Sequence, residues 1–236
     1  MWFSLEDIRQ FTQEQSDMVW VNDGKINVEN VFGRSLSLVT RFRDEHISDN
    51  LITWTPAWNE ALREDRHIFT ACATWSVKFS IESSDPQQKN LGRWGLMSAP
   101  EGNANLGGTS MGITKTCKDK RLAWEFLKFA TLSTEGARTL NSMGLMTTAK
   151  KPYEEDPSLK SYKSRWFGNQ DLGIYYMDHI IPSIKTRTLT SQDGVIHECL
   201  WMILNALNRD GNLSSEEAEE LLREELQKEL KDITVY

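Results

Sequence analysis

Residues 117–155 read CKDKRLAWEFLKFATLSTEGARTLNSMGLMTTAKKPYEE, and this stretch has the clearest helix signals of the chain. Asp119 can cap a first helix that runs to about Ala130, with apolar side chains recurring on one face. Ser133 can start a second helix, which ends before Gly144. The sequence therefore predicts two consecutive helices followed by a polar stretch.

Further helices are expected on both sides of this pair. The segments are 4–16, with Ser4 as N-cap, then 27–45, 58–64 and 194–208. A last helix follows Ser214, because Ser214 and Glu217 form a capping box and leucines then recur every four residues. Short apolar runs at 68–75, 94–97 and 110–114 are expected to be strands. Helices mixed with short strands indicate an α/β protein.

The composition excludes several classes of protein. The chain has 236 residues, enough for one large or two small domains, and its net charge of -7 argues against nucleic-acid binding. No apolar run is long enough to span a membrane. Residues 1–7 lack the basic and apolar regions of a signal peptide, which taken alone would suggest a cytoplasmic protein. The nine tryptophans suit a core, although a few of them could stack on sugar rings.

Motifs for catalysis or metal binding are missing from the sequence. Cys72 and His67 lie near each other, but no nucleophile-elbow motif surrounds Cys72. The histidines show no zinc-binding spacing, and Cys72, Cys117 and Cys199 form no C-x-x-C motif. No phosphate-binding loop occurs, and no pair of carboxylates stands out as a glycosidase dyad. We therefore expect a protein that is not an enzyme and has no cofactor.

Four blocks of sequence resemble one known family when they are taken in order. They are WNEALREDRHIFTACATW (58–75), GRWGLMSAPEGNANLGGTSMGITK (92–115), the helix pair of 117–155, and NRDGNLSSEEAEELL (208–222). Together they are similar to the extracellular solute-binding proteins of the maltose-binding-protein-like class, the receptors of ABC importers. Two positions depart from the family pattern: Asp65 replaces a usual glycine, and Thr147 or Thr148 stands where a proline is common.

The resemblance implies a type II periplasmic-binding-protein fold, mainly its carboxy-terminal lobe, with most of the amino-terminal lobe missing. Residues 1–109 would belong to the carboxy-terminal lobe. Residues 110–148 would be a strand and helix pair that normally packs on the amino-terminal lobe. Residues 149–236 would return to the carboxy-terminal lobe. The missing signal peptide then says nothing about the compartment, and the family location would be extracytoplasmic, in the periplasm or as a lipoprotein on the outer face of the membrane.

The same resemblance implies transport rather than chemistry: capture of an extracellular solute, a sugar or oligosaccharide, and its delivery to an ABC permease. Trp75 would stack on the sugar, and the glycine-rich crossing and the helix near residue 200 would add polar contacts. Core packing, a plain tight turn and helix packing are the competing interpretations of these three features. The ligand-binding residues expected are Trp75, Gly108, Thr109, Ser110, Glu198 and Trp201.

Other functions stay open at this point. A binding protein for iron or a polyamine is one alternative, and Tyr175-Tyr176 resembles the ferric-ion signature of one branch, although core packing suits this pair better. A secreted carbohydrate-active enzyme and a sensory module are two further alternatives. The apolar face of the first helix of the pair, with Leu122, Phe126 and Leu127, would lack its usual partner. A homodimer or a rearranged helix pair is therefore expected.

Overall fold

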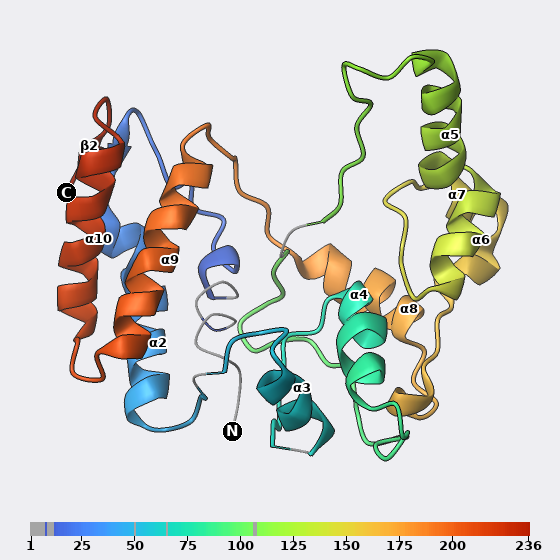
Figure 1. Cartoon of the computed structure of the whole chain (residues 1–236), viewed down its shortest axis with the longest axis horizontal. Helices are drawn as coiled ribbons and strands as arrows, with labels where there is room; N and C mark the ends of the chain where they lie inside the picture. Colours follow the sequence, from blue (N-terminus) through green and yellow to red (C-terminus); the bar gives the residue numbers. More distant parts are fainter. Residues whose placement is uncertain (1–7, 9–11, 50, 65, 106–107) are drawn as a thin grey trace. The chain divides into compact units, whose positions relative to one another are not determined.

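The computed structural model describes residues 8, 12–49, 51–64, 66–105 and 108–236. The chain forms two compact units, each assembled from separate segments (Figure 1). The first unit comprises Met1–Ala71, Glu101–Leu106 and Ile184–Tyr236. The second unit comprises Cys72–Pro100 and Gly107–Ser183.

The first unit is mainly helical. Its described elements are β1 (Lys25–Ile26), η1 (Glu29–Gly33), α2 (Arg34–Asp44), α3 (Pro56–Arg63), α9 (Asp193–Arg209), α10 (Ser215–Glu229) and β2 (Thr234–Val235). The π-helical turn η1 runs directly into α2, so the expected helix over 27–45 is confirmed. In Figure 1, α10 lies beside α9 and α2, and it packs against both.

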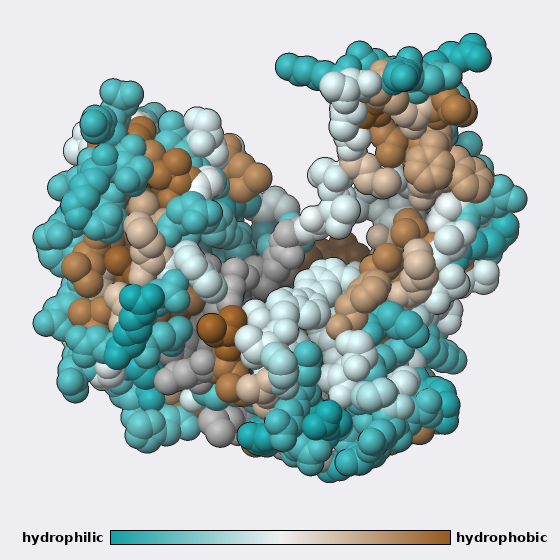
Figure 2. Space-filling model, in the orientation of Figure 1, coloured by the Kyte–Doolittle hydropathy of each residue, from teal (hydrophilic) through white to brown (hydrophobic). Residues whose placement is uncertain are grey.

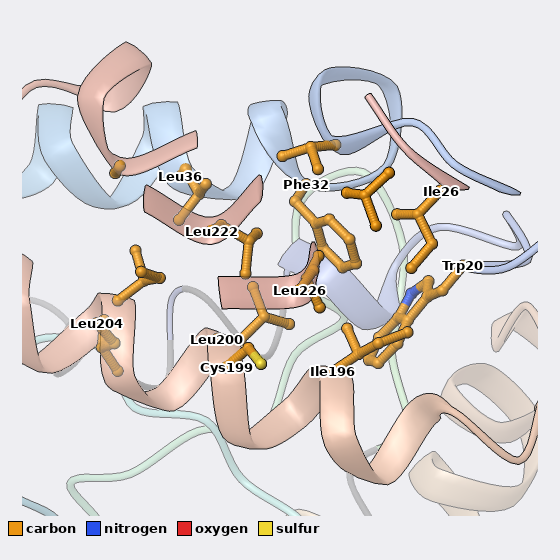
Figure 3. Packing of buried hydrophobic residues seen from close by; sticks show 14 of the residues in the cluster. Trp20, Ile26, Phe32, Leu36, Ile196, Cys199, Leu200, Leu204, Leu222 and Leu226 are labelled. Atoms are coloured by element: carbon orange, nitrogen blue, oxygen red, sulfur yellow. The ribbon is translucent and has the colours of Figure 1, made fainter. Parts of the chain in front are cut away.

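The core of the first unit forms where α2, α9 and α10 meet. Figure 3 shows leucines of the three helices converging with Trp20, Ile26 and Phe32. Leu222 and Leu226 are fully buried, as expected from leucines spaced one helical turn apart on a charged helix. Strands β1 and β2 pair in parallel, and this pair ties the end of the chain to the segment before α2.

A largely covered arginine side chain bonds to the loop between α9 and α10. The guanidinium of Arg43, on α2, donates to the carbonyl oxygens of Leu207 at 3.3 Å, Asp210 at 3.2 Å and Leu213 at 2.9 Å. The first of these carbonyl groups lies in the last turn of α9, where it has no helical partner, and the other two lie in the loop that leads to α10. The next helix then starts at the expected capping box, in which the Ser214 hydroxyl accepts from the Glu217 N–H and the Glu217 carboxylate accepts from the Ser214 N–H.

The second unit combines longer helices with several short turns. Its described elements are α4 (Thr74–Ser76), η2 (Val77–Glu82), α5 (Lys120–Leu132), α6 (Thr134–Ser142), α7 (Lys151–Glu155), η3 (Pro157–Lys160), η4 (Arg165–Phe167), α8 (Leu172–Tyr175), η5 (Tyr176–Ile180) and η6 (Ile181–Ser183). The expected pair α5 and α6 is confirmed, and Asp119 and Ser133 cap the two helices. A small core of Val77, Ile81, Leu96, Phe167, Leu172 and Tyr176 holds the unit together.

The three expected strands at 68–75, 94–97 and 110–114 are wrong. The first segment is irregular until α4 begins at Thr74, and the other two have no regular structure. Leu96 shows the reason, because its backbone N–H and C=O both bond to the side chain of Gln170, each at 2.7 Å. An amide side chain here takes the place of a neighbouring strand. Of the expected helix over 4–16, the described residues 8 and 12–14 are helical, while 15 is a turn and 16 is irregular; its cap Ser4 lies outside the described residues.

Candidate functional site

Trp75 lies at the start of a helix in the second unit, not at the tip of a strand. It is the second residue of α4, which continues into η2, and its side chain is half-buried. Val77 and Ile81 turn the other side of this helix into the core. One turn after Trp75, Phe79 is exposed. The two rings therefore follow the side of the helix that faces away from the core, where an aromatic ring can contact a ligand.

The glycine-rich crossing is exposed where the structure describes it. Gly108, Thr109 and Ser110 are all exposed, whereas Gly107 lies outside the described residues. Gly108 has a φ of +152°, and a Cβ built on it would meet no atom within 4 Å. The backbone of this segment is therefore open to solvent and can be approached by a ligand.

Glu198 and Trp201 lie on the outward face of α9 in the first unit. The buried residues of this helix, among them Ile196, Leu200 and Leu204, lie on the opposite face. Glu198 and Trp201 are one turn apart, and both are exposed. Trp201 is therefore a surface residue of this unit, on the same side of the helix as a carboxylate.

A buried polar cluster that the sequence did not reveal lies at the start of α9. The guanidinium of Arg187 stacks over the ring of Trp20, with the carbon Cζ 3.6 Å from the ring centroid. Arg187 also pairs with Asp193 through Nη1, and its Nε lies 3.5 Å from the Glu14 carboxylate. The His197 ring meets the edge of Trp20, with the centroids 4.9 Å apart. These residues come from distant segments of the chain, so no local sequence motif indicates the cluster.

Charge and burial act in opposite directions on Asp193. Burial by itself would raise the pKa of this carboxyl group, but hydrogen bonds from Thr190 and Arg187 outweigh burial and lower the pKa. The carboxylate is therefore held ionised at the amino end of α9, where the helix dipole also favours a negative charge. This cluster anchors the segment that enters α9, the helix with Glu198 and Trp201.

The adjacent tyrosines of the second unit are packing residues, as expected. Tyr176 is buried, and its hydroxyl group donates to the carbonyl oxygen of Cys72 at 2.8 Å. The Tyr175 hydroxyl accepts from the Ser98 N–H at 3.1 Å. Burial raises the pKa of Tyr176, which disfavours the phenolate that a ferric ion requires. Across the described part of the chain, no three His, Cys, Asp or Glu side chains come together as a possible metal site.

The environment of Cys72 does not suit a nucleophile. Burial raises the pKa of its thiol to about 11, so the thiolate is scarce at neutral pH. His67 belongs to the first unit, where it forms a buried pair with Asp49. In the residues described, none of the helices has both the length and the apolar character needed to cross a bilayer.

The candidate residues are divided between the two units. Trp75, Gly108, Thr109 and Ser110 belong to the second unit, and Glu198 and Trp201 to the first. Each unit thus presents an exposed or half-buried tryptophan on a helix whose opposite side is in the core. These residues leave side-chain and backbone groups accessible on both units.

Comparison with solved structures shows the fold. A structure described as an extracellular solute-binding protein family 1 has a TM-score of 0.77 and 19% identity, covering 97% of this chain and 58% of that one. The galacto-N-biose-/lacto-N-biose I-binding protein of an ABC transporter from Bifidobacterium longum, solved with lacto-N-biose, has a TM-score of 0.69 and 16% identity, covering 100% of this chain and 60% of that one. The chain therefore has the fold of type II periplasmic binding proteins and spans about three fifths of the length of these two.

Comparison with protein families shows the family of this chain. Among curated proteins, no sequence matches the chain. The family model for bacterial extracellular solute-binding proteins matches residues 2–165, which is more than half of the sequence and includes Trp75 and the α5–α6 pair. The chain belongs to the family of bacterial extracellular solute-binding proteins.

Proposed function

We propose that this protein is the solute-binding component of an ABC importer, which captures a solute outside the cytoplasm and delivers it to a membrane permease. The observation that carries the proposal is the family match over residues 2–165. The described residues fit a binding role, because ring surfaces and open backbone are available while the thiol of Cys72 is held protonated. For this role we propose an extracytoplasmic location, in the periplasm or as a lipoprotein on the outer face of the membrane.

The solute that we propose is a sugar or oligosaccharide. Trp75 and Phe79 offer ring surfaces away from the core of the second unit, and Trp201 offers one on the first unit, next to the Glu198 carboxylate. Indole faces attract the C–H faces of pyranose rings, and a carboxylate accepts from sugar hydroxyl groups. The Bifidobacterium protein of the same fold was solved with a disaccharide, which is consistent with this class of ligand. Iron is less favoured, because the hydroxyl groups of Tyr175 and Tyr176 form hydrogen bonds with backbone groups of the second unit.

We further propose that α5 packs on another folded surface. This helix has no buried residue, and Leu122, Phe126 and Phe129 form an exposed stripe spaced by four and three residues. Figure 2 shows apolar side chains gathered over this helix. The expected stripe contained Leu127 instead of Phe129, but Leu127 is half-buried, on a helix that packs against α6.

The first candidate for that surface is the amino-terminal lobe, because the two similar structures are longer than this chain. For the chain alone, a second copy or a rearranged helix pair takes its place.

Calorimetric titration against disaccharides, spermidine and ferric citrate tests the proposal. Saturable heat with a sugar, and none with the other two, is the expected result. A response to spermidine or ferric ion alone would replace the sugar by that solute. Release of the chromophore from chromogenic glycosides would instead favour a carbohydrate-active enzyme, and we expect none.

A further inference from the structure

The turn before α3 presents a group of apolar side chains to solvent. Ile52 and Trp54 are exposed, and so are Pro56 and Ala57 in the first turn of the helix. We call residues 52–57 the α3 knuckle. Single exposed apolar residues are common on protein surfaces, but here four occur within six positions.

Trp54 has a backbone conformation that a bulky residue rarely adopts. Its φ is +69°, in the left-handed region. Among the described residues, the other non-glycine positions with positive φ are all polar: Asp23, His46, Gln88 and Glu101. A large aromatic residue in this region is strained, and such strain persists where the surroundings fix the conformation, often at ligand clamps. Asn would adopt the same φ with less strain, so the local backbone does not explain why Trp stands here.

Neighbouring residues hold the knuckle in place. The N–H and the hydroxyl group of Thr55 both donate to the Ile52 carbonyl, at 3.3 and 2.7 Å. The Thr55 hydroxyl also accepts from the Trp58 N–H at 3.3 Å, which caps α3. The ring of Trp58 is buried, and its centroid lies 5.6 Å from that of Trp54. The Trp54 indole is therefore braced on a buried ring while about half of the residue, 52%, stays accessible.

We propose that Trp54 is a stacking platform for a pyranose ring, in addition to the residues on α9 of the same unit. This inference rests on the proposed function as a sugar-binding protein. The knuckle suits one sugar ring better than a protein partner, because a stable protein interface buries on the order of 800 Å² per partner, far more than six residues offer. A preformed, rigid ring surface also loses little conformational freedom when the sugar binds.

Resonances of the tryptophan indole N–H groups test this assignment one residue at a time. The chain has nine tryptophans, and Trp54→Phe, Trp75→Phe and Trp124→Phe assign three of the signals. The probes are lacto-N-biose, maltose and cellobiose at millimolar concentration, where a single stacking contact becomes populated. We expect the Trp54 signal to shift saturably with at least one of them. Trp124 is the matched control, because it is 51% exposed on the regular helix α5, and its signal should stay unchanged.

A second variant separates binding from folding. Trp54→Asn removes the ring and accepts the positive φ, so its melting temperature should equal or exceed that of the parent while the affinity of the responding sugar falls about tenfold, the scale of one aromatic platform. Trp54→Phe should keep most of the affinity. A large drop in melting temperature for Trp54→Asn, with unchanged affinity, would show that Trp54 is a packing residue and overturn the inference.

The same spectra distinguish failure of this inference from failure of the proposed function. A shift of Trp75 without a shift of Trp54 overturns the stacking role of Trp54 and leaves sugar binding intact. A shift of Trp54 supports the inference whether or not Trp75 responds. No shift of either signal with any of the sugars overturns both.

Discussion

Replacing Arg187 by Met should strongly destabilise the first unit. Arg187 is nearly inaccessible, with its side chain 5% exposed, and its partner Asp193 is 11% exposed. The variant keeps an unbranched apolar side chain in place of the arginine stem and removes the charged guanidinium, so Asp193 loses its cationic partner in a site that water hardly reaches. Removing one member of a buried ion pair typically costs about 3–5 kcal/mol, because the remaining charge stays buried.

Two further contacts of Arg187 also affect the expected loss of stability. The stack on Trp20 adds a desolvated cation–π interaction, typically about 2 kcal/mol. The contact with Glu14 is long, at 3.5 Å, and Glu14 is the most exposed of the partners, so its loss contributes little. The thioether side chain recovers part of the packing on the ring. We therefore expect Arg187→Met to lower the free energy of unfolding by about 3–5 kcal/mol at neutral pH.

The stability difference between the parent and Arg187→Met should also depend on pH, in a direction that the pKa of Asp193 determines. Contacts from Thr190 and Arg187 hold the pKa of Asp193 below its ordinary value, even though burial alone would raise it. A depressed folded-state pKa stabilises the fold above the unfolded pKa of about 3.9, and this contribution disappears as pH falls through the folded-state pKa. The difference between parent and variant should therefore be largest at neutral pH and shrink below about pH 4.

Urea unfolding followed by circular dichroism measures both effects. The matched control is Arg34→Met in the same unit, because Arg34 and Glu101 form an exposed pair, 51% and 69% accessible, worth at most about 1 kcal/mol. The double variant Arg187→Met/Asp193→Asn should recover part of the loss, since the amide needs no cation. A loss for Arg187→Met no larger than that of the control, or one that does not shrink in acid, would refute the reasoning.

Three other predictions concern the site and the helix termini. Trp75→Ala should weaken binding of any sugar that the chain recognises by about 1–3 kcal/mol in calorimetry, with cooperative unfolding retained; unchanged affinity with collapsed stability would make Trp75 a core residue. Ser214→Ala should lower the free energy of unfolding by about 1 kcal/mol, because the capping box is lost, and leave ligand affinity unchanged. Light scattering should find the chain self-associated through α5, unless the helix pair has rearranged. The variant Leu122→Ser/Phe126→Ser should reduce the association. A monomeric parent that binds a sugar at micromolar affinity would contradict this prediction.

Helices were predictable where their signals are local. The caps at Asp119, Ser133 and Ser214 form as expected, because each needs only an oxygen within three residues of a free backbone N–H. The stripe that buries Leu222 and Leu226 is likewise set by spacing along one helix. These features depend on neighbours in the sequence, so a pattern of residue types suffices to locate them.

Strands were not predictable, because a strand is defined by a partner that lies elsewhere in the chain. The apolar runs at 68–75, 94–97 and 110–114 resemble strands in composition, yet none is paired as a strand in the structure. In the second run, the Gln170 side chain takes the bonds of Leu96. Position 75 then falls at a helix start rather than a strand end, which changes the surroundings expected for Trp75.

The candidate site shows the same division. The resemblance named Trp75 and Trp201, and the structure places both on the sides of helices that face away from the core, although their contact with a solute stays a prediction. The stack of Arg187 on Trp20 joins residues far apart in the sequence, so no motif could indicate it. The positive φ of Trp54 is a backbone property that its residue type argues against.

By itself, the sequence determined the family, the succession of helices and the residues that cap them, because these follow from short-range spacing and from blocks kept in order. Only the tertiary structure decided which apolar runs remain unpaired, which side chains of α5 are exposed, and which charges and rings meet at the start of α9. Those outcomes depend on contacts between distant segments. The free energy of such contacts comes from burial and partner geometry, which a local pattern does not contain.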